Sequence, residues 1–492
     1  MRFKNLFINI GSSYAHIVLS VILNVMYVPI ALHYLGTERY GVWIVLQTFV
    51  NFLTIANFGI PTALLNLMAQ SDNNLEKSDI LLKGFKILSL ICLAVLVFCM
   101  ISYLIIVCFT SWLSSLSLEI RISSIILIVF FILRIPFQVS SAVFVANKKV
   151  FIAKIYEFST IALTFLSLLV MIYFKQNLIF LAGLSGVILL ILNIISFKSA
   201  LKILNIANYR KVENWIEARA IYRPGIALFA AGMGSLIVWN SDNIIVSKFL
   251  GFQEVAIYST AFRLFSFAFM SFGLIFGIIV PYYGQFFKER SWVKLQFFFN
   301  FNLFVIPFIA ICVWLFGWLF AKDIIFLWLG NYKLYAGSNL YFILGAYGMV
   351  FAYVCVMSNL LSSLNLLKGL VYITVAEAIV NLGASIFLVR FWGYEGVALG
   401  TLIASSTVPL AFLPFLINRN DKLEISFPFH KFLASIFFYI IMLFSLYKIN
   451  AHEYVFQLRL LISIGYLLLF LLFQYILNKK MIKEILKLQR EY

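Results

Sequence analysis

The sequence predicts an all-α integral membrane protein with about fourteen transmembrane helices. Its composition, its long apolar stretches and the distribution of its basic residues all lead to this prediction. Of the 492 residues, 63% are hydrophobic and only 11% are charged, whereas a soluble domain carries about 25% charged residues. Too few charged side chains remain to cover a surface in water. The lipid bilayer is therefore the expected solvent for nearly the whole chain.

Apolar stretches long enough to cross a bilayer recur along the entire sequence. A helix needs roughly 20 mostly apolar residues to cross the hydrocarbon core. The predicted spans are 9–33, 40–68, 84–109, 122–145, 154–174, 177–197, 224–249, 255–283, 295–320, 338–363, 369–390, 396–417, 431–449 and 457–477. The first span is longer than the apolar part of a signal peptide, so we expect it to stay in the protein as a helix.

The basic residues predict how the chain is oriented in the membrane. The net charge of +18 comes from 37 Lys and Arg against 19 Asp and Glu. Most of these Lys and Arg residues fall in every second connection between the predicted spans, and connections rich in them are cytoplasmic. The alternation predicts an even number of spans and cytoplasmic N and C termini. Because orientation explains the charge, we expect no binding to nucleic acid.

The chain is predicted to contain two lobes of similar construction. The segments YLGTERYGVWIVLQTF (Tyr34–Phe49) and FLGFQEVAIYSTAFRLF (Phe249–Phe265) each place an aromatic residue, Leu and Gly at a helix end and an acidic residue shortly after it. With six helices each, the lobes are expected to be related by a pseudo-two-fold axis along the membrane normal, with a substrate cavity between them. The expected parts are an N-terminal lobe at 1–198 (helices 1–6), a cytoplasmic amphipathic linker at 199–223, a C-terminal lobe at 224–417 (helices 7–12), and two extra helices with a basic cytoplasmic tail at 418–492.

Ionisable residues inside the predicted spans are candidates for function, because a charge at the bilayer centre costs about 2.5–3.5 kcal/mol. These residues are Arg134, Asp242, Arg263 and Glu377. Arg134 shares a helical face with Gln138, and Glu377 shares one with Asn381. Such faces are expected to point at a cavity rather than at lipid. For Asp242 and Arg263, the alternative is a structural ion pair between helices or an orientation towards the membrane surface.

Polar side chains also line one face of each of the first two spans. His16 and Asn24 share one face, and Gln47 and Asn51 share another. These residues are expected either to face the substrate cavity or to form hydrogen bonds between helices, and the sequence leaves both alternatives open.

Sequence patterns of catalytic and metal sites are missing. The four His residues are scattered, the five Cys residues form no C-x-x-C pair, and no Gly-rich phosphate-binding loop is found. We therefore predict that the chain is not an enzyme and uses no cofactor. Coupling to a proton or sodium gradient is left open.

Three segments carry a resemblance to a known family. YLGTERYGVW, NFGIPTALLN (Asn57–Asn66) and DNIIVSKFLGFQEVAIYSTAFRL (Asp242–Leu264) resemble polysaccharide exporters of the multidrug, oligosaccharidyl-lipid and polysaccharide flippase superfamily, and the bacterial O-antigen flippases above all. The likeness covers residues 1 to about 417, as two six-helix lobes. Many flippases of this group have twelve spans, so the final two helices are a departure.

The resemblance implies a transport function. It implies that undecaprenyl-diphosphate-linked oligosaccharide moves from the cytoplasmic to the outer leaflet of the bacterial inner membrane by alternating access. The implied partners are this substrate, membrane lipid and other polysaccharide-assembly proteins. The implied substrate-binding residues are Arg134, Arg263, Gln138, Gln47, Asn51, His16 and Asn24. Asp242 and Glu377 are the implied ion-coupling residues.

Three other functions stay open. A cation-coupled multidrug exporter of the same superfamily would usually end after twelve helices. A peptidoglycan lipid II flippase also has fourteen spans, but the first two helices here offer only Arg39, at a turn, instead of an early arginine cluster. A membrane-embedded polysaccharide polymerase would need a long external loop, and the longest external connection here runs only from about 321 to 337.

Overall fold

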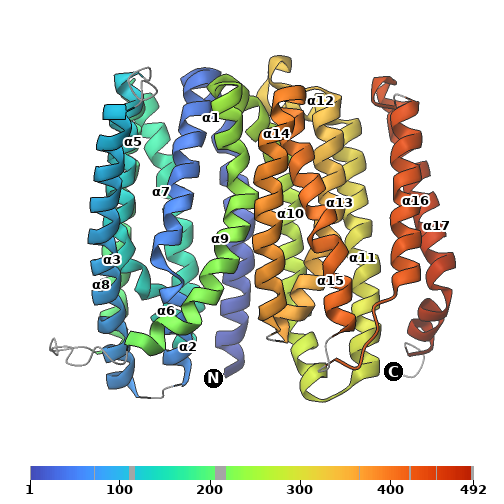
Figure 1. The fold of residues 1–492 in the computed structure, drawn as a ribbon, viewed down its shortest axis with the longest axis horizontal. Coiled ribbons are helices and arrows are strands. Elements are labelled where there is room, and N and C mark those ends of the chain that lie inside the picture. The colour runs from blue at the N-terminus through green and yellow to red at the C-terminus, as the bar shows by residue number, and fades with distance from the viewer. Residues whose placement is uncertain are drawn as a thin grey trace. The chain divides into compact units, whose positions relative to one another are not determined.

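The computed structural model describes residues 2–70, 73–109, 117–205, 218–364, 366–419, 423–449 and 451–488. Within these ranges the chain is helical, with short turns and no strand (Figure 1). It divides into two compact units, Met1–Ile244 and Ile245–Tyr492. The centre of the predicted linker, residues 206–217, lies outside the described residues.

The first unit is built mostly from long helices, and short 3₁₀ segments interrupt two of its crossings. Its elements are α1 (Arg2–Leu53), η1 (Thr54–Asn57), α2 (Ile60–Gln70), α3 (Asn74–Phe109), α5 (Leu118–Arg134), η2 (Ile135–Val139), α6 (Ser140–Ala146), α7 (Val150–Tyr173), α8 (Leu178–Ile203) and most of α9 (Ala218–Phe249). Within α1 the chain reverses at Gly36, whose φ is 74°, so this element crosses the membrane twice. The short η elements continue a crossing rather than end one.

The second unit is also built from long helices joined by short connections. Its elements are α10 (Phe252–Lys288), α11 (Trp292–Leu319), α12 (Ala321–Leu329), η3 (Tyr332–Leu334), α13 (Ser338–Ser363), α14 (Leu367–Thr407), α15 (Pro409–Asn418), α16 (Phe429–Lys448), η4 (Ala451–Glu453) and α17 (Phe456–Leu488). The chain reverses within α14 at Gly393, where φ is 56°. With both reversals counted, the described helices make fourteen crossings, and the predicted all-α membrane fold is confirmed.

The two sequence segments that suggested a repeat have the same local structure. Gly36 and Gly251 each follow a leucine at a helix end, and their φ angles are 74° and 102°. An L-residue with a Cβ is strained in this left-handed region, whereas glycine adopts it readily. Each glycine therefore permits a tight reversal between two successive crossings, which explains why both segments place Gly at this position.

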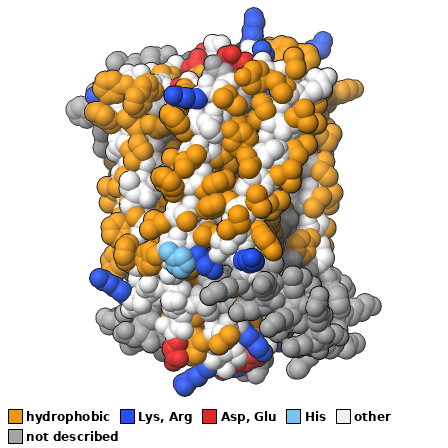
Figure 2. Space-filling view, turned by 90° about the vertical axis from the view of Figure 1, so that its right-hand side faces the viewer, with side chains coloured by type: hydrophobic (Ala, Val, Ile, Leu, Met, Phe, Trp, Pro, Cys, Tyr) orange, Lys and Arg blue, Asp and Glu red, His pale blue; other side chains and the backbone are white. Residues whose placement is uncertain are grey.

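Hydrophobic side chains form a broad exterior band on the face that α16 and α17 occupy. Figure 2 shows this band lying between two zones in which Lys, Arg, Asp and Glu gather. Exposed residues on these helices include Phe437, Phe444, Leu461 and Ile476. Such a contiguous apolar surface is expected to contact lipid rather than water.

A ladder of polar side chains joins α16 to α17 inside this apolar region. The Gln474 amide donates a hydrogen bond to Ser435 Oγ (2.8 Å), and the Asn478 amide donates one to Gln474 Oε1 (3.1 Å). Lys431 Nζ donates to Asn478 Oδ1 at 3.3 Å. Near the opposite end of the pair, the hydroxyls of Ser445 and Tyr466 lie 2.9 Å apart. These contacts fix how the two helices face each other.

Arg459 attaches α17 to the rest of the second unit. Its Nη1 donates hydrogen bonds to the Leu319 carbonyl (2.7 Å) and to Asp323 Oδ2 (2.6 Å). The guanidinium also lies over the rings of Phe320 and Phe456, at 5.2 and 6.0 Å from their centroids. One side chain therefore contacts the end of α11, the start of α12 and its own helix.

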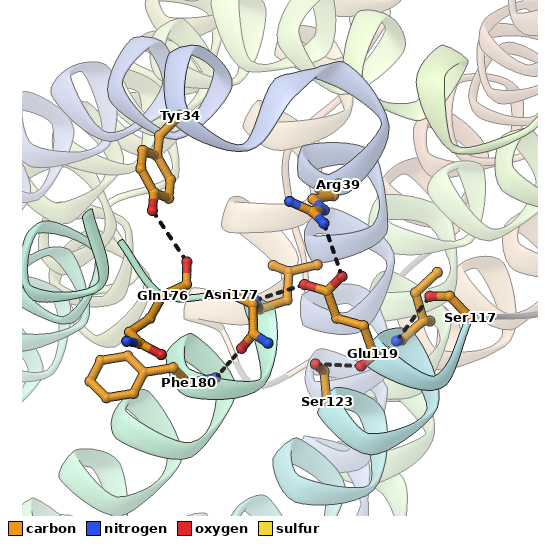
Figure 3. Close-up of polar contacts among 10 residues, drawn as sticks. Tyr34, Arg39, Ser117, Glu119, Ser123, Gln176, Asn177 and Phe180 are labelled. Carbon is orange, nitrogen blue, oxygen red and sulfur yellow. Dashed lines mark hydrogen bonds and ion pairs between the residues drawn. The ribbon is translucent and has the colours of Figure 1, made fainter. Parts of the chain in front are cut away.

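A polar cluster closes one end of the first unit, where the reversal at Gly36 meets the starts of α5 and α8 (Figure 3). Glu119 Oε1 accepts the backbone N–H of Leu178 at 3.0 Å, and its Oε2 lies 3.3 Å from Arg39 Nη2. Asn177 caps α8 by accepting the N–H of Phe180. The Tyr34 hydroxyl donates to the Gln176 carbonyl at 3.3 Å. The cluster joins segments that are far apart in the sequence.

We expect Glu119→Ala to lower the free energy of unfolding by about 1–2 kcal/mol, because it leaves an N–H at the start of α8 unpaired. Arg39→Ala should lower it by less than about 1 kcal/mol, since the Arg39 side chain is 58% exposed and exposed ion pairs contribute little. Equilibrium unfolding in detergent measures both effects. Equal losses in the two variants would contradict this ranking.

Candidate functional site

The first unit contains a partly open polar cavity of about 290 Å³. Five of its elements contribute polar groups to the wall: η1, η2, α6, α7 and α8. The polar lining residues are Asn57, Gln138, Ser140, Ser141, Tyr156, Glu157, Thr160, Asn193 and Ser196. Amides, hydroxyls and one carboxylate therefore surround a single space within an otherwise apolar helix bundle.

Two breaks in neighbouring crossings bring backbone and side chains to this cavity. At η1 the helix ends before Phe58 and Gly59, whose φ angles are 47° and 66°. At η2 the break follows Pro136, which lacks a backbone N–H and cannot continue the α-helical hydrogen bonds. The Asn57 amide donates to Gln138 Oε1 at 3.2 Å, so the two breaks meet. Non-helical backbone inside a membrane protein is tolerated where it lines a cavity of this kind.

Hydrogen bonds and ring contacts hold the opposite wall. The hydroxyls of Ser140 and Ser196 lie 2.8 Å apart, which links α6 to α8. The Tyr156 hydroxyl lies 2.7 Å from Ser199 Oγ. The Tyr156 ring stacks on Phe144, with centroids 5.7 Å apart and planes inclined by 11°. The aromatic pair thus provides a flat, rigid surface beside polar groups.

Glu157 places a charge at the cavity. Its Oε2 accepts a hydrogen bond from Lys154 Nζ at 2.6 Å and lies 3.7 Å from His16 Nε2. At 3.7 Å the imidazole makes no hydrogen bond with the carboxylate. The cavity therefore carries a carboxylate whose charge is partly balanced by one lysine.

Arg134, the first predicted cationic residue, ends α5 immediately before the break at η2. Its guanidinium carbon lies 4.0 Å from the centroid of the Phe131 ring. Among the described residues no carboxylate forms an ion pair with Arg134, and its buried Nε has no hydrogen-bond partner. Arg134 does not line the cavity, whereas its predicted neighbour Gln138 does.

The predicted residues of the first two spans lie at different places. Asn51 donates a hydrogen bond to Asn240 Oδ1 of α9 at 3.2 Å, while Asn24 donates one to the Ser20 carbonyl of its own helix at 2.8 Å. His16 faces Glu157, as described above. Gln47 is half-buried in α1. Asn51 thus forms the kind of interhelical hydrogen bond given as the alternative, Asn24 bonds within its own helix, and His16 lies near the cavity residue Glu157.

In the second unit, Glu377 belongs to a seam between the two halves of α14. Ser405 Oγ donates to Glu377 Oε1 at 2.5 Å, and the Asn381 amide donates to Thr401 Oγ1 at 2.8 Å. The predicted polar face of this crossing therefore turns towards the next crossing. Arg263 is half-buried on α10 and forms no ion pair among the described residues. Asp242 is buried on α9, at 4% exposure.

Sequence reasoning missed most of the cavity wall. Asn57, Tyr156, Asn193 and Ser196 are single polar residues in apolar spans, and no pattern distinguishes them from residues that bond their own helix. The proline in IPFQV and the glycine in NFGIP were the available signals, because both mark breaks next to the cavity.

Comparison with known proteins identifies the fold. No protein-family model and no curated protein sequence matches the chain. The inward closed conformation of the lipid II flippase MurJ is similar with a TM-score of 0.71 and 19% identity, over 96% of this chain and 98% of that chain.

An inward-facing multidrug resistance MATE family transporter of the MOP superfamily is similar with a TM-score of 0.65 and 12% identity, over 80% of this chain and 93% of that chain. A MOP superfamily transporter from Pyrococcus furiosus is similar with a TM-score of 0.55 and 12% identity, over 84% of this chain and 93% of that chain. These neighbours are transporters rather than enzymes. The likeness supports the predicted fold, while the superfamily and the O-antigen flippase family stay predictions. The chain thus has the multi-pass transporter fold that MurJ and the MATE proteins share.

Proposed function

We propose that this chain is a flippase for lipid-linked oligosaccharides. It carries undecaprenyl-diphosphate-linked units of O-antigen, or of a related surface polysaccharide, from the cytoplasmic to the outer leaflet of the bacterial inner membrane. The polar cavity of the first unit is the observation that carries this proposal. Sugar hydroxyls both donate and accept hydrogen bonds, and the wall offers amides, hydroxyls and a carboxylate beside the stacked rings of Phe144 and Tyr156. Its volume is small for a ligand pocket, so it suits a sugar-sized group.

Arg134 supplies the second part of the proposal. A guanidinium that has no acidic partner among the described residues is available to bind an anion. Arginine binds phosphate oxygens through paired N–H groups, and such charge-assisted bonds are stronger than neutral ones. We assign the diphosphate of the substrate to Arg134, with Arg263 as a second cationic residue along the path.

Ion coupling is assigned to Asp242 and Glu377. A carboxylate removed from water is costly unless it is paired, protonated or bound to a cation. Glu377 accepts a hydrogen bond from the neutral hydroxyl of Ser405, so a proton or sodium ion would offset the remaining cost of burying its charge. Occupancy of Glu377 would then shift the balance between the inward-open and outward-open states.

The proposal is tested by Gln138→Leu and Asn193→Leu, in a strain that lacks its own flippase. Each variant removes cavity hydrogen bonds, and we expect surface glycan to fall about tenfold because such bonds together contribute about 1.4 kcal/mol. Gln176→Leu, which changes an exposed amide outside the cavity, is the matched control. Arg134→Ala and Glu377→Gln extend the series to the diphosphate and coupling residues. Unchanged glycan at normal protein levels would remove the altered residue from the mechanism.

Transport of lipid II is a second candidate, favoured by one observation. The likeness to the lipid II flippase MurJ covers 96% of this chain, whereas the likeness to the MATE transporter covers 80%. Growth of a strain depleted of its lipid II flippase, restored by this chain, would favour that substrate. Drug resistance that follows expression while glycan is unaffected would favour a multidrug exporter.

A further inference from the structure

A second cavity of about 290 Å³ lies in the second unit, between α13, α14 and the added helix α16. It lies where α14 reverses and α16 ends. Its main lining residues are Asn339, Phe342, Trp392, Glu395, Leu399 and Tyr447. This groove is separate from the polar cavity of the first unit, and none of the residues assigned to transport line it.

Glu395 is the one charged residue among those that line the groove. It is half-buried, and among the described residues no lysine or arginine forms an ion pair with it. The Asn339 side chain lies within hydrogen-bonding reach of the carboxylate. A neutral amide compensates a buried negative charge only in part, so the groove is complementary to a cation.

Three aromatic rings surround the same space. The Phe342 and Tyr447 rings have centroids 5.4 Å apart, and Trp392 is 56% exposed at the reversal of α14. Ring faces attract ammonium groups, and the attraction is stronger where water is excluded. Tyrosine and tryptophan also favour the depth of lipid headgroups. Both properties agree with an ammonium group at this depth.

The surroundings of the groove favour a lipid over a soluble amine. Phe391, next to the lining residue Trp392 on α14, and Phe444 on α16, the helix of the lining residue Tyr447, are 65% and 62% exposed and offer apolar surface on both helices. Acyl chains can lie against this surface. Lys448 follows Tyr447 at the end of α16, and its Nζ lies 5.3 Å from the centroid of the Phe444 ring. A phosphate beside this apolar surface would meet that positive charge.

We propose that this groove binds a phospholipid with a primary ammonium headgroup, such as phosphatidylethanolamine. The ammonium lies on Glu395 among Phe342, Trp392 and Tyr447, and the acyl chains follow α14 and α16. The added helix therefore forms one wall of a lipid site. This inference does not depend on the identity of the transported substrate.

Native mass spectrometry of the full chain tests this proposal, with phosphatidylethanolamine and phosphatidylglycerol of identical acyl chains as probes. The wild-type chain should retain phosphatidylethanolamine about tenfold more strongly, as expected for one charge-assisted hydrogen bond. In Glu395→Gln, the ratio of phosphatidylethanolamine retained to phosphatidylglycerol retained should fall close to one. Glu453→Gln, which changes an exposed carboxylate in η4 outside the groove, should leave it unchanged.

A second variant keeps the carboxylate and fills the groove. Leu399→Trp should lower retention of phosphatidylethanolamine to the level of phosphatidylglycerol. If Glu395→Gln does not fold, the Leu399→Trp variant decides whether the proposal holds. The proposal is wrong if the wild-type chain retains both lipids equally, or if the preference persists in a folded Glu395→Gln or Leu399→Trp variant. None of these outcomes depends on a transport assay, so they are independent of the proposed flippase function.

Discussion

Gly345→Ala should destabilise the second unit by about 3 kcal/mol. A Cβ at Gly345 would lie 1.7 Å from Trp314 Cδ1, far inside any contact distance. Trp314 is fully buried and stacks on Trp318, with centroids 5.6 Å apart, and its indole N–H donates to the Phe342 carbonyl. The ring therefore has no space into which it can move, and overpacking of a filled core typically costs about 1–3 kcal/mol.

Gly383→Ala is the matched control for this prediction. Nothing lies within 4 Å of a Cβ at Gly383 on α14, so the change should alter the free energy of unfolding by less than about 1 kcal/mol, and in the stabilising direction, since alanine favours helix. Unfolding in mixed micelles measures both variants. A similar unfolding midpoint for the two variants would show that Gly345 of α13 does not pack against Trp314 of α11.

Arg459→Leu is expected to cost about 2–3 kcal/mol and to release α17 from α11 and α12. The guanidinium is only 11% exposed and its two hydrogen bonds end on different partners, so leucine would leave both acceptors without this donor. Asp323→Asn should cost less, because Asp323 is 40% exposed and an amide still accepts one bond. Amide hydrogen exchange of α17, measured together with global unfolding, shows whether the loss of stability is confined to α17.

Arg390→Leu serves as the comparison, since this exposed arginine contacts only the Phe249 ring, at 5.9 Å, in the described part of the chain. It should change stability by less than about 1 kcal/mol. If Arg459→Leu left exchange of α17 as slow as in the wild-type chain, the attachment would have to reside in the apolar contacts alone.

The fold could be predicted from the sequence because its causes are local. Long apolar stretches set the crossings, and glycines such as Gly36 and Gly251 mark tight reversals. Pro136, beside the cavity residue Gln138, likewise marks a break that the sequence shows directly. These features need no knowledge of how distant segments pack.

The rest of the cavity depends on packing between distant segments. Asn57 meets Gln138 only because two broken crossings lie side by side, and Glu157 reaches the cavity only because α7 packs beside α6 and α8. The polar face of α14 that contains Glu377 was likewise not predictable, because its partner lies on another crossing. A polar face in a bilayer must find some partner, and the sequence pattern does not say whether that partner is a chamber or, as here, the neighbouring crossing that contains Ser405.

The hydrogen-bond ladder between α16 and α17 bears on how the protein is made. In lipid, apolar contact alone gives little force to join two helices, and interhelical hydrogen bonds supply much of what is needed. Gln474, Ser435 and Asn478 satisfy one another within a single hairpin. These two helices can thus pair with each other first and dock afterwards through Arg459, as a separate step of biogenesis.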